Sequence, residues 1–116
     1  MKILIALSTF NRIEITEMCL KNLSSVRSDD IKLVVYDDNS TTYNIATGSV
    51  YCDEIVRFPK NIGIDSSRAR AMRDFVYRFK EYDLLYFTDN DSIHDPDFVN
   101  VLINLFNWQK EIKIRR

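Results

Sequence analysis

Asp89 and Asp91 are the residues whose type and spacing most suggest chemistry, since they stand two apart directly after an apolar run. The run, Leu-Leu-Tyr-Phe at residues 84–87, is typical of a strand buried on both faces of a parallel sheet. In open α/β sheets, ligands bind at the carboxyl ends of the strands. Carboxylates so placed can hold Mg²⁺ or Mn²⁺, ions that keep coordination positions for substrate phosphates. An acidic turn without a ligand is the competing interpretation.

Two further apolar runs also lead into polar residues. Residues 2–8 precede Thr9, Asn11 and Arg12, and residues 31–36 precede Asp37 and Asp38. If the three runs are parallel strands, their carboxyl ends share one edge of the sheet and these polar groups converge. Several carboxylates at one edge repel each other unless a cation neutralises them. The convergence therefore favours a metal and phosphate site over generic acidic turns.

The segment 66–82 is predicted to be a helix capped by its first residue, a serine. Four of its residues share one face, which is predicted to pack on the core: Arg68, Met72, Phe75 and Phe79. Arg68 would then face the interior at the positive end of the helix dipole, so it needs an anionic partner. A carboxylate such as Asp38 and a ligand phosphate both meet that need, and both interpretations stay open.

A second face of the same predicted helix carries alternating charges. Arg70, Asp74 and Arg78 follow each other at intervals of four residues. This pattern is typical of a solvated row of ion pairs, which places Asp74 at the surface.

The apolar periodicity alternates between strand and helix patterns along the chain. It predicts strands at residues 2–8, 31–36, 54–58 and 83–88, helices at about 14–26 and 66–82, and a last helix from Pro96 with Asp95 as N-cap. Residues 43–46 hint at a short helix. The order indicates right-handed βαβ units in one α/β domain over residues 1–116, a three-layer, open, mostly parallel sheet with helices on both faces. Residues 107–116 are expected to fray.

Composition is consistent with a folded cytoplasmic domain. The chain has 116 residues, of which 46% are hydrophobic, and a formal net charge of −1, so no nucleic-acid or membrane-surface footprint is indicated. No apolar run approaches the ~20 residues of a membrane span. Cys19 and Cys52 lie far apart and form no metal-binding motif. The single histidine, His94, either contacts a metal bound at Asp91 or is a polar residue at the entry to the last helix.

Four short segments follow one another within residues 2–106. They are Thr-Phe-Asn-Arg at 9–12, Val-Val-Tyr-Asp-Asp-Asn-Ser at 34–40, Asn-Ile-Gly at 61–63 with Ser-Arg at 67–68, and Thr-Asp-Asn-Asp at 88–91. Together they resemble the T-Y-N-R, strand-DDxS, N-x-G-x-x-x-A-R and D-x-D motifs of inverting glycosyltransferases of family two, which have the GT-A fold. The order and spacing of four motifs make this resemblance much more specific than any one motif. Ala69 and Ala71 depart from the family pattern, which has Asn and Gly there.

The resemblance implies a binding site for a nucleotide-diphosphate sugar, with a UDP-type donor favoured. Seven residues would form it: Thr9, Asn11 and Arg12 beside the nucleoside, Asp38 on the base, Arg68 on the base or diphosphate, and Asp89 and Asp91 facing ribose, diphosphate and a Mn²⁺ or Mg²⁺ ion. Asp91 is the expected direct metal ligand. The metal would act as a Lewis acid toward the departing nucleoside diphosphate.

The family's fold continues well beyond the length of this chain, and its second half supplies the acceptor site and an acidic general base. Inversion needs such a base to deprotonate the acceptor hydroxyl. The acids after Asp91, at 95, 97 and 111, lie on or before the last helix, and no catalytic residue is assigned. We therefore expect the donor-binding half of a transferase, incomplete or inactive alone. The alternative is a non-catalytic nucleotide-sugar-binding or interaction module.

The last predicted helix is apolar nearly all round. Its apolar residues are Phe98, Val99, Val101, Leu102, Ile103, Leu105, Phe106 and Trp108. About half of this surface has nothing in the chain to cover it, which predicts a homo-oligomer, most simply a two-fold dimer.

The segment 84–92 also resembles the strand-D-x-D motif of haloacid-dehalogenase-type phosphotransferases, with Asp89 as nucleophile and Asp91 as acid and base. Those enzymes carry the motif on their first strand and need later Lys and Asp motifs. The position of Asp89 near the end of this chain argues against that interpretation.

Overall fold

A computed structural model describes residues 1–41 and 50–114 of the chain. The elements are β1 (Ile3–Thr9), α1 (Ile13–Val26), β2 (Ile31–Asp37), β3 (Glu54–Arg57), α2 (Ile64–Tyr77), β4 (Leu84–Asp89) and α3 (Phe98–Ile114). Four strands pair in the order β3-β2-β1-β4, and every pairing is parallel. The short helix suggested at residues 43–46 lies outside the described residues.

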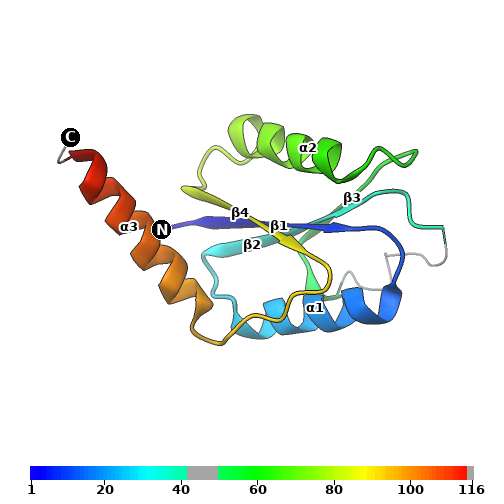
Figure 1. The fold of residues 1–116 in the computed structure, drawn as a ribbon, viewed down its shortest axis with the longest axis horizontal. Coiled ribbons are helices and arrows are strands. Elements are labelled where there is room, and N and C mark those ends of the chain that lie inside the picture. Colours follow the sequence, from blue (N-terminus) through cyan, green and yellow to red (C-terminus); the bar gives the residue numbers. More distant parts are fainter. Residues whose placement is uncertain (42–49, 115–116) are drawn as a thin grey trace.

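The helices cover both faces of this sheet, as predicted (Figure 1). Strand residues alternate between the faces, so odd-numbered and even-numbered positions of β1 enter different cores. Ile3, Ile5 and Leu7 pack with residues of α1 and α3, whereas Leu4 and Ala6 pack with residues of α2. β1 is buried along nearly its whole length because it is central in the sheet and covered on both sides. The predicted three-layer α/β architecture is confirmed.

The register of β1 brings three strand ends to the same edge. Thr9 stands opposite Asp37 of β2, and Ser8 stands opposite Asp89 of β4. Beyond the strands, the backbone N–H of Asp38 donates to the carbonyl oxygen of Thr9 at 2.9 Å. The polar residues that follow β1, β2 and β4 therefore do converge, as the order of elements predicted.

The side of α2 that faces the sheet differs from the predicted one. Its buried residues are Ser67, Ala71 and Asp74, whereas Met72 is 55% exposed. The helix begins at Ile64, one turn of chain earlier than a serine cap at position 66 would require, and Gly63 precedes it with a φ of +85°. The prediction that Met72 faces the core was therefore wrong. The rotation of the helix about its axis follows from the contact of Asp74 with the sheet.

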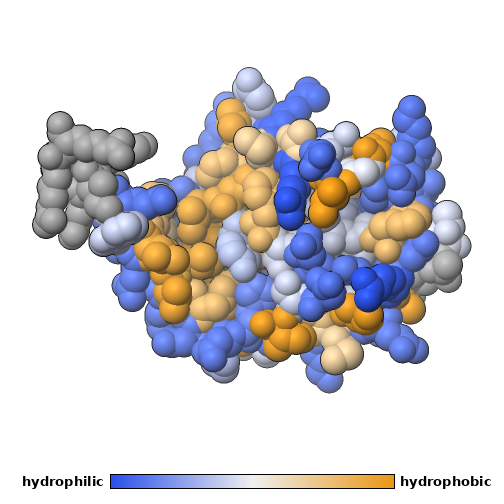
Figure 2. All heavy atoms as spheres, viewed as in Figure 1, coloured by the Kyte–Doolittle hydropathy of each residue, from blue (hydrophilic) through white to orange (hydrophobic). Residues whose placement is uncertain are grey.

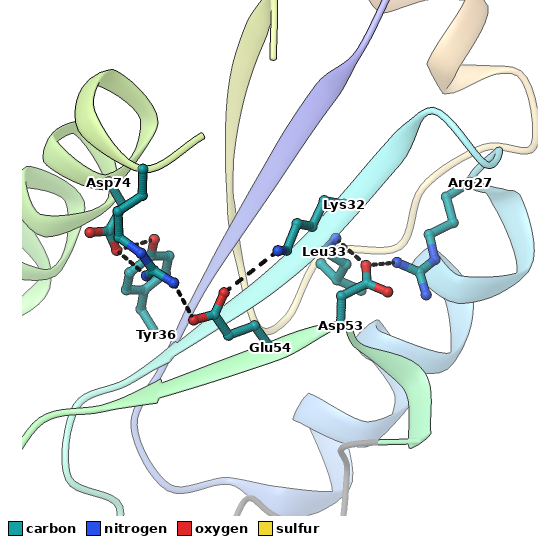
Figure 3. A network of polar contacts seen from close by, with 8 residues as sticks. Arg27, Lys32, Leu33, Tyr36, Asp53, Glu54 and Asp74 are labelled. Atoms are coloured by element: carbon teal, nitrogen blue, oxygen red, sulfur yellow. Dashed lines mark hydrogen bonds and ion pairs between the residues drawn. The ribbon is translucent and has the colours of Figure 1, made fainter. Parts of the chain in front are cut away.

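Asp74 meets the phenol of Tyr36, which is fully buried on β2 (Figure 3). The Tyr36 hydroxyl donates to Asp74 Oδ2 at 2.9 Å, and Arg70 Nε and Arg78 Nη1 donate to the same carboxylate at 3.2 and 3.4 Å. Burial, together with the bond to the anionic Asp74, raises the pKa of Tyr36, so the phenol stays a donor. The prediction of a solvated ion-pair row was wrong, because the central acid is a buried acceptor.

The same network continues to the edge strand β3. Arg78 Nη2 donates to Glu54 Oε1 at 2.7 Å, and Lys32 Nζ lies 3.7 Å from Glu54 Oε2. Before β3, Asp53 accepts from the backbone N–H of Leu33 at 2.7 Å and pairs with Arg27 (Figure 3). These contacts attach β3, the shortest strand, to β2 and to the helices on both faces.

The helix α3 is less completely covered than the other two. A turn precedes it, in which the N–H of Asp97 donates to Asp95 Oδ1 at 2.9 Å and the N–H of Phe98 to the Asp95 carbonyl at 3.0 Å. Hydrophobic surface gathers between α3 and the beginning of β4 (Figure 2), and Leu105 and Trp108 are 54% and 58% exposed. The pairing of two copies through this surface stays a prediction. The helix runs on to Ile114, through most of the segment expected to fray. No helix among the described residues could span a membrane.

The buried phenol gives a direct test of the α2–sheet contact. Tyr36→Phe removes one hydrogen bond to a charged acceptor and should lower the free energy of unfolding by about 1.5–3 kcal/mol. Tyr77→Phe is the matched control. Tyr77 lies on α2 and is 70% exposed, so the loss of its hydroxyl should change the free energy of unfolding by less than about 0.5 kcal/mol. Urea denaturation followed by circular dichroism measures both. Equal effects in the two variants would contradict the buried role of Tyr36.

Candidate functional site

A cavity of about 440 Å³ opens at the carboxyl edge of the sheet, between β1, β4 and the beginning of α2. Five of the seven residues predicted from the sequence line it: Thr9, Arg12, Asp38, Asp89 and Asp91. The other lining residues are Ser8, Phe10, Asn61, Gly63, Ile64, Ser67 and Asn90. Arg68 joins the site through Asp89, whereas Asn11 does not line the cavity.

Arg68 extends from the first turns of α2 toward β4. Its Nη2 lies 3.5 Å from Asp89 Oδ1, and its guanidinium lies over the ring of Phe87, 5.7 Å from the centroid. The anionic partner that its position required is therefore Asp89 and not Asp38. The Arg68 and Asp89 side chains are 42% and 49% exposed, so the pair is worth no more than about 1 kcal/mol. A pair of this strength can open to admit an anionic ligand.

Asp38 holds the loop that leads into α2. Its Oδ1 accepts from the N–H of Ile62 at 2.6 Å, and its Oδ2 accepts from the N–H of Gly63 at 3.0 Å. A carboxylate has about four lone-pair positions, so two hydrogen bonds leave capacity for a ligand donor. The loop thus orients the Asp38 carboxylate. Its unused lone pairs remain available in the cavity that Asp38 lines. Sequence reasoning did not anticipate this bond, because the loop lies more than twenty residues further along the chain.

The loop after β1 is shaped by Asn11. Its N–H donates to Ser40 Oγ at 2.9 Å, and its Oδ1 accepts from the N–H of Thr41 at 2.8 Å. Asn11 and Arg12 both have positive φ, 55° and 61°, a left-handed conformation that Asn tolerates better than most residues. The position of Asn11 supports a loop-shaping role. Arg12, at the same bend, is exposed and lines the cavity.

Asn90 separates the two acids and was missed from the sequence. Its amide Nδ2 donates to Thr16 Oγ1 on α1 at 3.0 Å and lies 3.4 Å from Thr9 Oγ1. The two threonine hydroxyls are 3.0 Å apart and buried. This cluster fixes the turn on which Asp89 and Asp91 stand. The sequence did contain a signal for this residue. Side chains alternate along a strand, so a polar residue between Asp89 and Asp91 is directed to the opposite side of the chain from the two acids.

Asp91 is the exposed acid of the site. It forms no ion pair within the part of the chain that the structure describes. Groups of three or more His, Cys, Asp or Glu side chains suited to a metal are likewise absent from residues 1–41 and 50–114. Two carboxylates nevertheless fit Mg²⁺ or Mn²⁺, because such ions keep waters and take further ligands from substrate phosphates. The donor set is therefore suited to a metal that arrives with a diphosphate.

The His94 ring contacts Tyr86 and Phe98, so the structure favours its role at the helix entry. Its Nε2 lies 3.0 Å from the Tyr86 hydroxyl, and its ring packs on Phe98 with centroids 4.7 Å apart. Asn22 on α1 exchanges two hydrogen bonds with the His94 backbone, of 2.7 and 3.1 Å. Burial lowers the pKa of His94 and raises that of Tyr86. The neutral imidazole thus joins α1, β4 and the beginning of α3.

Comparison with known proteins identifies the family to which the chain belongs. A model of glycosyl transferase family 2 matches residues 4–112 of the chain. No curated protein matches it. Among solved structures, S. aureus TarS residues 1–349 is similar with a TM-score of 0.73 at 18% identity, over 92% of this chain and 32% of that one. The same TarS fragment in complex with UDP-GlcNAc has a TM-score of 0.70 at 18% identity, over 92% of this chain and 31% of that one.

A second enzyme in the comparison is the mannosyltransferase PcManGT from Pyrobaculum calidifontis, in complex with GDP-Man and Mn²⁺. Its TM-score is 0.67 at 18% identity, over 84% of this chain and 30% of that one. At this identity the similarity shows a shared fold. The chain spans about a third of the length of these solved structures.

The environment of His94 predicts a pH-dependent stability. The unfolded chain takes up a proton at this residue below about pH 6.5, whereas the folded chain resists it because the ring is buried. The unfolded state then binds more protons, so the free energy of unfolding should fall as pH is lowered from 7.5 to 5.5. Urea titrations at both pH values measure this fall. His94→Asn should lose that dependence, and an unchanged dependence in the variant would contradict the assignment, since His94 is the single histidine.

Proposed function

The chain belongs to glycosyl transferase family 2, and on that premise we propose that it binds a nucleotide-diphosphate sugar for transfer to an acceptor. The observation that carries the proposal is the cavity at the carboxyl edge, with two acids on one turn and a cation within reach of them. Its volume of about 440 Å³ is within the range of small-ligand sites. Solved proteins with this fold bind UDP-GlcNAc and GDP-Man, which supports this ligand class.

In this proposal the two acids and Arg68 receive the diphosphate end of the donor. Asp91 is the direct ligand of a Mn²⁺ or Mg²⁺ ion, since it is exposed and forms no ion pair among the described residues. Asp89 faces the ribose, diphosphate and metal, and Arg68 turns from Asp89 toward phosphate oxygens. When bound, the metal supplies Lewis-acid stabilisation of the leaving diphosphate. Arg68 adds a second positive charge, which favours diphosphate binding.

The nucleoside occupies the other end of the cavity, beside β1 and the loop before α2. Phe10 is 44% exposed and lines the cavity, so its ring offers a face on which a base can stack. Asp38 offers its unused lone pairs to a base N–H, in an orientation set by Ile62 and Gly63. An acceptor of one N–H suits a uracil-type base, so we favour a UDP-type donor.

A non-catalytic binding module is the second candidate, and one observation favours it. Asp95 and Asp97, two acids that follow Asp91, accept hydrogen bonds at the beginning of α3. They serve the helix entry, so neither is assigned as the base that deprotonates an acceptor. Donor binding without transfer to any acceptor hydroxyl would favour the binding module. Release of nucleoside diphosphate that depends on an acceptor would favour the transferase.

The metal role of Asp91 can be tested by calorimetric titration with UDP and GDP, each with and without Mn²⁺. We expect metal-dependent binding, and Asp91→Asn should weaken it at least about tenfold because a neutral amide replaces an anionic ligand. Asp95→Asn is the matched control, because the new amide oxygen can still accept the Asp97 N–H and binding should be unchanged. Nucleotide binding that is the same in both variants would exclude Asp91 as a ligand.

The stacking role of Phe10 predicts a loss of affinity on truncation. Phe10→Ala should weaken nucleotide binding by about 1–3 kcal/mol, the usual contribution of a base stacked on an aromatic ring. Tyr77→Ala is the control, since that exposed ring lies on the outer side of α2 and outside the cavity. The same titrations measure both variants. If binding survives Phe10→Ala undiminished, the base lies elsewhere.

A further inference from the structure

Asp37 stands beside Asp38, at the end of β2, but it does not line the candidate site. Its side chain is fully buried. A buried carboxylate is costly unless hydrogen bonds and a cation compensate its charge. The groups that compensate this one come from the turn that follows β2 and from the end of β3. Asp37 therefore joins two chain segments at the carboxyl edge of the sheet.

Ser40 is the centre of these contacts and is itself 1% exposed. Its hydroxyl donates to Asp37 Oδ1, and its backbone nitrogen lies 3.4 Å from both oxygens of that carboxylate. The same hydroxyl oxygen accepts the N–H of Asn11, in the loop after β1, at 2.9 Å. Asn39, within the turn, has a φ of +58°, a left-handed conformation that asparagine tolerates in tight turns. The turn is thus closed on the end of β2 and attached to the loop after β1.

Arg57, the last residue of β3, holds the turn from outside. Its Nη2 donates to the Ser40 carbonyl oxygen at 2.9 Å and lies 3.3 Å from Asn39 Oδ1. Its Nε lies 3.9 Å from Asp37 Oδ2, so this guanidinium pairs with the buried acid. The planar guanidinium suits this role, because its donors form a rigid fork that can serve several acceptors at once. One exposed side chain therefore contacts both ends of the turn.

Asp38 lies within this turn, so the contacts of its neighbours fix its backbone. Its own N–H donates to the Thr9 carbonyl oxygen at 2.9 Å, and its carboxylate accepts the N–H groups of Ile62 and Gly63. Arg57 does not line the cavity, so it acts on the turn rather than on a ligand. Because the side chain of aspartate is short, a shift of the turn would move its carboxylate away from a base N–H.

We propose that Arg57, through Asp37 and the turn at residues 37–40, is a positioning residue that holds Asp38 for recognition of the nucleotide base. The inference rests on the proposed function, in which Asp38 accepts a base N–H. A fixed carboxylate accepts the N–H that uracil has at N3 and disfavours cytosine, which has an acceptor there. A mobile carboxylate discriminates less, because it can move toward the amino group of cytosine. Arg57 thus sets base selectivity without contact with the nucleotide.

Calorimetric titration with UDP, CDP and inorganic pyrophosphate, each with Mn²⁺, tests this role. The wild-type chain should bind UDP at least about tenfold more tightly than CDP. Arg57→Ala should weaken UDP binding about fivefold and lower the preference for UDP by the same factor, because charge-assisted contacts with the turn are lost. Its affinity for pyrophosphate should be unchanged, since Arg68, Asp89 and Asp91 receive the diphosphate at the other end of the cavity.

Arg78→Ala is the matched control. The Arg57 and Arg78 side chains are both 44% exposed, and Arg78 also attaches β3 to the rest of the fold, through Glu54. Its loss should leave the preference for UDP unchanged, because its acid partners, Glu54 and Asp74, lie outside the turn at residues 37–40. Arg57→Lys keeps a cation beside the turn, so its preference for UDP should lie between those of wild type and Arg57→Ala. Circular dichroism confirms that each variant is folded.

Hydrogen exchange of the Ile62 and Gly63 N–H groups reports on the position of Asp38 without any nucleotide. Exchange should be faster in Arg57→Ala than in wild type or Arg78→Ala, because the accepting carboxylate is no longer held. Equal exchange in all three proteins, an unchanged preference for UDP in Arg57→Ala, or equal losses of UDP and pyrophosphate would each overturn the positioning role. Absence of nucleotide binding by the wild type would overturn the proposed function, and hydrogen exchange would still decide whether Arg57 holds Asp38.

Discussion

Parallel pairing of β1 with β2 and β4 is the constraint on which the site depends. Hydrogen bonding in register places Thr9 beside Asp37 and Ser8 beside Asp89, so three chain segments leave the sheet at one edge. The strands are held there because β1 is central and buried on both faces. A parallel sheet is stable only when both faces are covered, which α1, α3 and α2 accomplish. The position of the acids is thus a result of the packing of the core.

Side-chain hydrogen bonds beyond the ends of the strands hold the loops at that edge. Asn90 reaches Thr16 across the turn between the acids, and Asp38 accepts two N–H groups from the loop before α2. Each bond joins segments that are distant in the sequence. Together they hold a cavity whose walls come from β1, β4 and α2, and they leave Asp91 exposed at its lining. The same side chains therefore hold the loops and shape the cavity.

Helix α2 shows how one residue can determine two surfaces. Asp74 points inward to Tyr36, and this hydrogen bond attaches the helix to β2. Arg70 and Arg78 donate hydrogen bonds to the same carboxylate. The same rotation leaves Met72 exposed on the outer side of the helix. A buried carboxylate with this many donors is stable because its charge is compensated by hydrogen bonds and cations.

The sequence by itself determined the parallel sheet, the covering of both faces and the convergence of Thr9, Asp38, Asp89 and Asp91. These follow from apolar runs of strand length that end in polar residues, a local pattern with one spatial consequence. Only the tertiary structure decided that Arg68 pairs with Asp89, that Asp38 holds Gly63, and that Asp74 is buried. Helical spacing defines which residues share a face, but the direction of that face depends on its partner. For α2 that partner is Tyr36, a phenol 38 residues earlier in the chain, which no local pattern connects to Asp74.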